Sequence, residues 1–376
     1  MRQPLQVFVL MLTGLLLANT AQAAGPLTLQ RFPRLAEYLS AFDATEAAVF
    51  EELVIIREQP DAASGLEQLL ETLANLSDPA AVHSFGPDGH LSMVGPLRIF
   101  ETRATPGLVA MIRARHDSSA AAQALTRSEL FTPEAVAVLR RGREFEAQLY
   151  EILLDDRLAD KRGAVSQAVQ TYLADDALSV ASAAKDFKLM TEHPYANAFR
   201  AGFPQLCGVL WSTRWLQLAV LEPLVSNEDA AVKEAGVNTT MERLQDKLIQ
   251  YHGMMGLPSE MPTVPVVSPL MYNRHPEAAR ILDNLSMLEI VLADILSHPQ
   301  ISERRVAMQE TLDKFTDKSA FLVSERDYLL YSLRGGIYNQ GGPALGGMDQ
   351  SERNRSRDEQ EHTGHVPMPI GIRVDM

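Results

Sequence analysis

Residues 279–296 read ARILDNLSMLEIVLADIL, and this stretch decides the fold class. Its large apolar residues recur at steps of four and three, at Ile281, Leu285, Leu288, Leu292 and Ile295. That spacing places them on one continuous stripe of a helix. The stretch therefore predicts an amphipathic helix whose apolar face packs against a core.

The same periodicity recurs along most of the chain. Thr132, Pro133 and Glu134 supply an N-cap, a proline at the first helical position and an acid in the first turn, and they open a helix with an apolar face. The pattern predicts further helices near 28–41, 44–58, 63–77, 106–115, 119–127, 163–173, 177–191, 204–225, 229–251, 277–296 and 303–333. We therefore expect an all-α protein, a compact multi-helix bundle.

Strand signals are few. Residues 90–101, HLSMVGPLRIFE, have short β-compatible runs on either side of Gly95 and Pro96. This arrangement predicts a β-hairpin.

The N-terminus predicts export. Arg2 precedes an apolar run over residues 7–18, and Ala21 and Ala23 are the small residues that a signal peptidase reads. We expect residues 1–23 to be a signal peptide cleaved before Ala24, and the protein to be periplasmic. We expect no stable membrane span after cleavage.

Composition shifts divide the rest of the chain. The polar stretch DDRLADKRG, residues 155–163, interrupts the apolar pattern, so we expect helical regions over 24–156 and 157–334, either as two domains or as one. Residues 335–376 are rich in glycine and charge, which predicts a flexible tail.

Charge and cysteine content narrow the function. The formal net charge of −14 makes nucleic acid an unfavourable partner, because phosphate binding relies on clustered Lys and Arg. Cys207 is the single cysteine, so no disulfide forms within one chain, and its apolar neighbours predict a buried thiol.

The segment 204–225 is apolar nearly all round and contains Trp211 and Trp215. Such a helix is either a bundle centre or a membrane span. Arg214 lies in its middle, where a bilayer would make the charge costly, so we expect the central core helix.

No catalytic signature is present in the sequence. There is no covalent haem motif, nucleophile elbow, zinc HExxH motif or Walker loop. The single E-x-x-H pair, Glu359 with His362, lies in the tail, which argues against a di-iron bundle. An acid/base enzyme using Glu242 and Asp246, which share a helix face, remains open.

Residues 252–277, HGMMGLPSEMPTVPVVSPLMYNRHPE, form a proline-rich segment that we expect to cover the helical body without regular structure. Its imidazole and thioether groups are the ligands that Cu(I) prefers. The candidate copper ligands are His252, Met254, Met255, Met271 and His275, with Met261 nearby.

The same segment is a candidate ligand site. A pocket beneath it, walled by Tyr272, Arg274, Trp211 and Trp215, would hold an apolar or anionic small molecule. The apolar end of the tail, VPMPIGIRVDM, would add to a partner protein or dock on its own domain.

Two functions follow from the sequence. The first is a non-catalytic periplasmic protein without a cofactor that binds an envelope protein partner or a small ligand. The alternative is an envelope metal-binding protein or oxidoreductase linked to copper.

Overall fold

The computed structural model describes residues 24–77, 95–115, 129–226, 229–249 and 257–334. These residues are helical apart from connecting segments and one isolated β-bridge between Lys185 and Leu322. The all-α bundle is therefore confirmed. The predicted signal peptide, the tail and the helix near 119–127 lie outside the described residues.

The helices follow one another in chain order. They are α1 (Pro26–Arg31), α2 (Pro33–Arg57), the 3-10 turn η1 (Pro60–Ala62), α3 (Ala63–Ser77), α4 (Arg98–Ala114), α5 (Pro133–Leu154), α6 (Lys161–Leu173), α7 (Lys188–Thr191), α8 (Ala198–Gly202), α9 (Pro204–Ala219), α10 (Leu221–Val225), α11 (Ala230–Ile249), α12 (Val264–Val267), α13 (Pro269–Arg274), α14 (Pro276–Ser297), α15 (Arg304–Thr316) and α16 (Glu325–Arg334).

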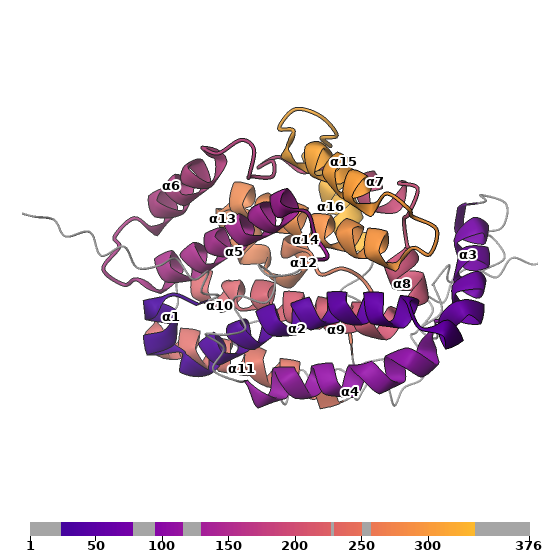
Figure 1. The fold of residues 1–376 in the computed structure, drawn as a ribbon. Coiled ribbons are helices and arrows are strands. Elements are labelled where there is room, and N and C mark those ends of the chain that lie inside the picture. The colour runs from indigo at the N-terminus through magenta and orange to yellow at the C-terminus, as the bar shows by residue number, and fades with distance from the viewer. Residues whose placement is uncertain (1–23, 78–94, 116–128, 227–228, 250–256, 335–376) are drawn as a thin grey trace, which may run out of the picture.

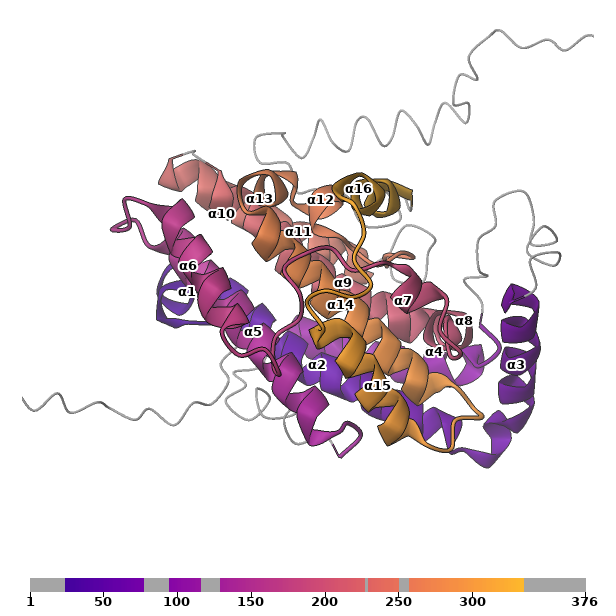
Figure 2. The same ribbon diagram turned by 90° about the horizontal axis from the view of Figure 1, so that it is seen from above.

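Helix α14, which contains the periodic stretch 279–296, lies at the centre of the bundle. Its residues from Ala278 to Ser297 are buried apart from Arg280. Helices α4 and α11 lie below α2 and α9, and α5, α14 and α15 lie above them (Figures 1 and 2). Buried apolar side chains from α2 to α16 form one continuous core.

Helix α9 is the central core helix that the sequence predicts, since its residues from Leu206 to Ala219 are all buried. Its N-terminus is capped from a distance, because Glu101 accepts hydrogen bonds from the backbone N–H groups of Gln205 (2.8 Å) and Leu206 (3.0 Å). None of the helices in the described ranges combines the length and the apolar character that crossing a membrane would require.

The predicted hairpin over 90–101 is wrong for residues 95–101, the part that the structure describes. Arg98 to Glu101 form the first turn of α4, which also begins eight residues before the predicted start at Pro106. A proline inside a helix costs about 3 kcal/mol. Burial of Phe100 and the capping bonds of Glu101 offset this cost.

The predicted break between residues 41 and 44 is also wrong, because α2 is continuous through Asp43. Asp43 faces the interior and does not cap a second helix.

The predicted helix 177–191 is reduced to α7 at its end. The preceding segment is held instead by a side chain of α14, since Asn284 donates to the carbonyls of Ala181 (2.8 Å) and Ala183 (2.9 Å) and accepts from Lys185 N–H (3.1 Å). These hydrogen bonds from Asn284 take the place of the backbone hydrogen bonds that a helix would form in this segment.

The predicted helix 303–333 is interrupted between α15 and α16. Asp317 ends α15, and its carboxylate accepts from the N–H groups of Ser319 (2.7 Å) and Ala320 (3.0 Å). Phe321 then adopts a left-handed backbone conformation with φ of 56°. The chain therefore turns before α16 begins.

The described part of the covering segment, residues 257–277, packs on the body as expected, but it contains α12 and α13 where the sequence predicts no regular structure. Polar side chains hold it. Glu222 of α10 accepts from Leu270 N–H (2.8 Å), Asp283 of α14 accepts from Val264 N–H (3.0 Å), and Arg274 donates to the carbonyl of Val225.

Candidate functional site

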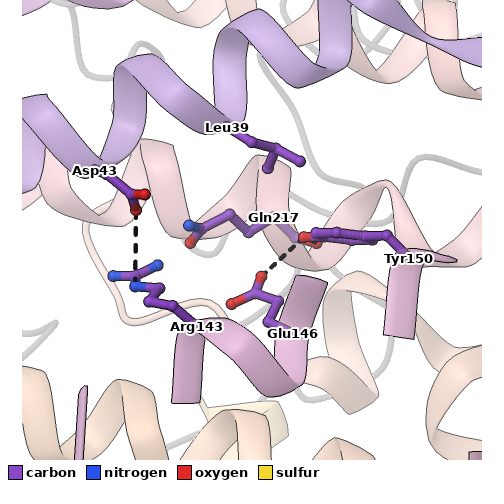
Figure 3. Close-up of a pocket in the computed structure, with 6 residues that line it drawn as sticks. All are labelled: Leu39, Asp43, Arg143, Glu146, Tyr150 and Gln217. Atoms are coloured by element: carbon purple, nitrogen blue, oxygen red, sulfur yellow. Dashed lines mark hydrogen bonds and ion pairs between the residues drawn. The ribbon is translucent and has the colours of Figure 1, made fainter. Parts of the chain in front are cut away.

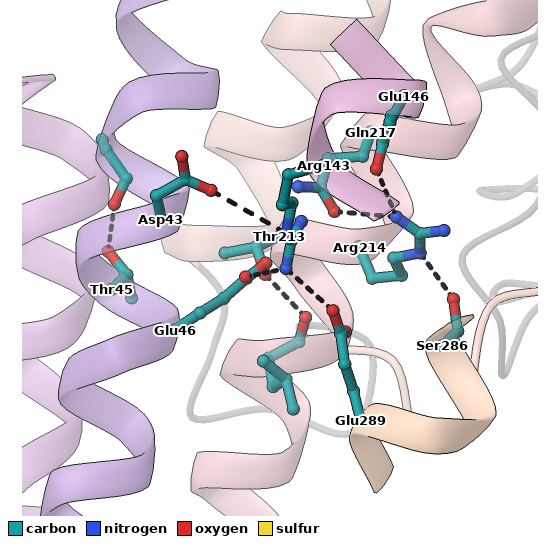
Figure 4. Close-up of polar contacts among 12 residues, drawn as sticks. Asp43, Thr45, Glu46, Arg143, Glu146, Thr213, Arg214, Gln217, Ser286 and Glu289 are labelled. Carbon is teal, nitrogen blue, oxygen red and sulfur yellow. Dashed lines mark hydrogen bonds and ion pairs between the residues drawn. The ribbon is translucent and has the colours of Figure 1, made fainter. Parts of the chain in front are cut away.

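Polar side chains from four helices meet at the centre of the bundle (Figure 4). Each helix contributes two side chains three residues apart, which a helix places on one side. The pairs are Asp43 and Glu46 on α2, Arg143 and Glu146 on α5, Arg214 and Gln217 on α9, and Ser286 and Glu289 on α14.

Arg143 links three of these helices. Its Nη2 donates to Glu46 of α2 and, over 2.9 Å, to Glu289 of α14. Its Nε lies 4.0 Å from Asp43 Oδ1, which is an ion-pair distance but too long for a hydrogen bond. Arg143 is therefore the shared cation of three carboxyl groups.

Arg214, buried in the middle of α9, holds the second half of the network. Its Nη1 donates to Glu146 Oε2 (2.8 Å), its Nε donates to Ser286 Oγ (2.6 Å) and its Nη2 donates to the carbonyl of Leu282 (2.9 Å). Glu146 Oε1 in turn accepts from the hydroxyl of Tyr150 (2.8 Å). The charge of Arg214, which argued against a membrane span, is thus paired with Glu146 inside the protein.

The pKa values of these buried carboxyl groups are shifted in opposite directions. Burial raises the pKa of Asp43 to about 7, against the opposing charge of Arg143. Burial likewise raises the pKa of Glu46 to about 8. For Glu146, the charges of Arg214 and Arg143 outweigh burial and lower the pKa. Near neutral pH, Asp43 is therefore partly protonated and Glu46 mostly protonated, while Glu146 is ionised.

A small cavity opens beside this network (Figure 3). Its volume is about 10 Å³. The lining residues are Leu39, Asp43, Arg143, Glu146, Tyr150 and Gln217. A cavity needs about 10–15 Å³ to hold one water molecule, so this one has room for a single water or for one polar group of a ligand.

Two residues of the cavity lining each have a buried atom without a hydrogen-bond partner. The two atoms are Asp43 Oδ1, an acceptor while the carboxyl is ionised, and Arg143 Nη1, a donor. Buried polar groups are normally hydrogen-bonded, and leaving one unpaired costs about 1–3 kcal/mol. The pair therefore marks the place where a polar ligand would gain most.

The structure places the predicted ligand-binding residues on several helices. The guanidinium of Arg200 lies 6.0 Å from the ring of Trp211, and the ammonium of Lys247 lies 5.1 Å from the ring of Trp215. Tyr272 packs 5.9 Å from the ring of Tyr328 in α16. Arg274 caps α10 as described above. The pocket walled by these residues stays a prediction, and the cavity beside Arg143 is a different site.

Of the predicted copper ligands, His252, Met254 and Met255 lie outside the described residues. Met271 is fully buried in α13, and Met261 is buried nearby. His275 occupies the N-cap position of α14, and burial, with Arg162 and Arg274 nearby, lowers its pKa to about 4. In the described ranges, no group of three His, Cys, Asp or Glu side chains could hold a metal ion. The copper hypothesis stays a prediction.

The structure also places Cys207 and the pair Glu242 and Asp246. The thiol of Cys207 is buried as expected, and burial raises its pKa well above the ordinary value. Glu242 and Asp246 are both exposed on α11.

Sequence reasoning missed the central network, although a signal was present. Charged residues lie inside apolar helical stripes in AFDATEAAVF on α2 and in LSMLEIVL on α14. Buried charges require partners, so such residues on several helices predict a shared polar centre.

Comparison with known proteins adds no relative: no family model matches the chain, and neither a curated protein nor a solved structure matches it significantly.

Proposed function

We propose that this chain is a non-catalytic binding protein of the periplasm, exported by residues 1–23, and that it binds a small polar ligand in the cavity between α2, α5 and α9. One observation carries the proposal. Asp43 and Arg143 line the same cavity, and each has a buried atom without a hydrogen-bond partner, Asp43 Oδ1 and Arg143 Nη1.

The surroundings of the cavity support binding more than chemistry. Glu146 and Arg214 form an ion pair with each other. The hydroxyl of Tyr150 is buried and donates to Glu146. Burial raises the pKa of Tyr150 well above its ordinary value, which keeps it a hydrogen-bond donor. Fixed donors and acceptors of this kind orient a ligand.

The first test is thermal unfolding of the mature chain, residues 24–376, with a panel of small polar solutes at millimolar concentration. A ligand at about 100 times its Kd adds about 2.7 kcal/mol to the free energy of unfolding. We expect at least one solute to raise the Tm of the wild type and of Asp246→Asn, an exposed control, but not that of Asp43→Asn. If no solute raises the Tm of the wild type, the small-ligand function is wrong.

Export is tested separately. Expression of the full chain with its N-terminus intact should yield a periplasmic protein whose mass begins at Ala24. A cytoplasmic protein retaining residues 1–23 would contradict the localisation.

Binding of an envelope protein has its own support. Leu330 and Leu333 are 57% and 56% exposed on the outer face of α16, the last described helix before the tail. Deletion of residues 335–376 should remove a co-purifying partner. An unchanged set of partners would end this version of the proposal.

A further inference from the structure

Helix α1 is fastened to α5 by one carboxylate. Glu151 Oε2 accepts from the backbone N–H of Leu27 (2.8 Å), and Glu151 Oε1 accepts from the N–H (2.8 Å) and the hydroxyl (2.7 Å) of Thr28. An ionised carboxyl has about four acceptor positions. One position on Oε2 is therefore still available to a donor.

Glu151 forms no ion pair among the described residues. The neighbouring cations Arg31 and Lys161 pair instead with Asp156, at 2.8 Å and 3.7 Å. A half-buried carboxylate is stabilised by a nearby cation, and neither of these side chains supplies one.

The chain enters α1 directly beside this carboxylate. A Cβ on Gly25 would lie within 2.7 Å of three side-chain atoms of Glu151 and would displace that side chain from its bonds to α1. The preceding residue, Ala24, is 3% exposed and packs in the apolar core. Ala24 therefore has a fixed position one residue before the contact with Glu151.

Ala24 is also the residue that the predicted cleavage makes the first of the mature chain. Hydrolysis breaks the bond between the carbonyl carbon of Ala23 and the nitrogen of Ala24, and water gives its hydroxyl to the carbon and a hydrogen to the nitrogen. The new amine then binds a proton at neutral pH, because the pKa of an α-amino group is about 7.7–8.0. Only the bonds of Ala24 separate this charge from Gly25, so it stays within reach of the carboxylate that touches Gly25.

We propose that cleavage before Ala24 supplies the cation that Glu151 lacks, and that the α-ammonium of the mature chain pairs with Glu151 Oε2 and fastens the N-terminus to α5. This inference rests on the proposed export, which provides the cut. In the uncleaved chain the same nitrogen is a neutral amide, so maturation completes the attachment of α1.

Acetylation of the terminal amine tests the ion pair. Only the neutral amine reacts with acetic anhydride, and a paired carboxylate raises the pKa of the amine because it favours the charged form. The mature chain, residues 24–376, is labelled with trace reagent between pH 6 and pH 10, and its N-terminal peptide is quantified by mass spectrometry.

We expect the midpoint of this pH profile to lie at least about one pH unit higher in the wild type than in Glu151→Gln, which makes labelling at pH 7 about tenfold slower. Glu144→Gln, at an exposed position of α5, is the matched control and should behave as the wild type.

The midpoint separates pairing from simple burial. A terminus that is buried without a partner would react slowly, but its midpoint would be ordinary or lowered, because burial disfavours the charged amine. Such a profile, or equal midpoints in the wild type and Glu151→Gln, would overturn the inference.

A second variant leaves Glu151 intact. Adding Gly-Ser ahead of Ala24 moves the ammonium away from the carboxylate and should increase the equilibrium constant for unfolding by about two- to fivefold in urea titrations. The same addition to Glu151→Gln should have no effect, and an equal effect in both proteins would overturn the inference. If Glu151→Gln fails to fold, the labelling midpoints of the mature and extended chains decide the question.

Export and the ion pair fail separately. An exported protein that begins at Ala24 but has an ordinary amine midpoint overturns the ion pair and leaves export standing. A protein that is never cleaved overturns both.

Discussion

Arg143 shows what a single side chain does in this fold. It is the hydrogen-bond partner of Glu46 and Glu289, and both acceptors are largely buried. Replacing a buried ion pair with apolar groups is often neutral, but removing one partner leaves the other charge unpaired. Its removal should therefore cost far more than the loss of an exposed charge.

We expect Arg143→Met to lower the free energy of unfolding by about 3–5 kcal/mol at pH 8. At pH 5 the loss should be smaller, because Glu46 then holds a proton and needs less compensation. Urea titration followed by circular dichroism measures both values. Arg326→Met, at an exposed site on α16, is the control and should behave as the wild type; an equal loss in both variants would contradict the role of Arg143.

The raised pKa values predict how stability depends on pH. Burial raises the pKa of Asp43 and Asp283 to about 7, and that of Glu46 and Glu101 to about 8. The unfolded chain releases these protons near pH 4, so between pH 4 and pH 8 the folded state binds more protons. The contribution of these groups to stability is therefore lost as pH rises.

His275 opposes this trend only below about pH 6.5, because its lowered pKa of about 4 lets the unfolded chain bind a proton there. Between pH 6.5 and 8 we therefore expect the free energy of unfolding to fall. Urea titrations at pH 6.5, 7.2 and 8.0 measure this, and the slope should be shallower in Glu46→Gln. Stability that rises through this window would be inconsistent with the raised pKa values.

At the scale of elements, Gly142 sets how closely α5 approaches α14. A Cβ at this position would lie 2.8 Å from the methyl carbons of Leu285. The two helices carry half of the central network, so their spacing also positions Arg143 and Glu289.

Gly142→Ala should destabilise the protein by about 1–3 kcal/mol, because added volume in a packed core forces neighbours apart. Gly107→Ala on α4 is the matched control, since its Cβ would meet nothing within 4 Å and alanine favours a helix. The control should be neutral or stabilising by up to about 1 kcal/mol. Both are read from urea unfolding midpoints, and equal effects would contradict the close helix contact.

The covering segment depends on a side chain of α14. Asp283 accepts from Val264 N–H of α12 and, over 2.6 Å, from the hydroxyl of Tyr328 of α16. Asp283→Ala leaves both donors buried and unpaired, which should cost about 1–3 kcal/mol for each. Tyr328→Phe removes only one bond and should cost less.

Hydrogen exchange of the Val264 amide separates this local effect from global unfolding. We expect exchange to accelerate in Asp283→Ala and to stay near the wild-type rate in Tyr328→Phe. Unchanged exchange in both would mean that the segment is held by apolar packing alone.

At the scale of the whole molecule, regular apolar spacing made the helices predictable. The stripe from Ile281 to Ile295 predicted α14, and Thr132 with Pro133 predicted the start of α5, where Thr132 caps the N–H of Ala135. The failures occurred where long-range bonds replaced local ones. Asn284 holds an irregular segment that its own composition predicted to be helical.

The candidate cavity could not be predicted from the sequence pattern of any single helix, because long-range packing forms it. Asp43, Arg143 and Gln217 come from helices far apart in the chain, and only their packing brings them together. A lone carboxyl within an apolar stripe shows that a partner exists, but not which residue supplies it.

The most direct test of the small-ligand function is native mass spectrometry of the exported protein with the panel of small polar solutes at millimolar concentration. We predict a 1:1 complex for the wild type that is absent, or at least about tenfold weaker, in Asp43→Asn. A wild-type protein that stays ligand-free at every concentration, or a complex formed equally by both proteins, would contradict the cavity as the binding site.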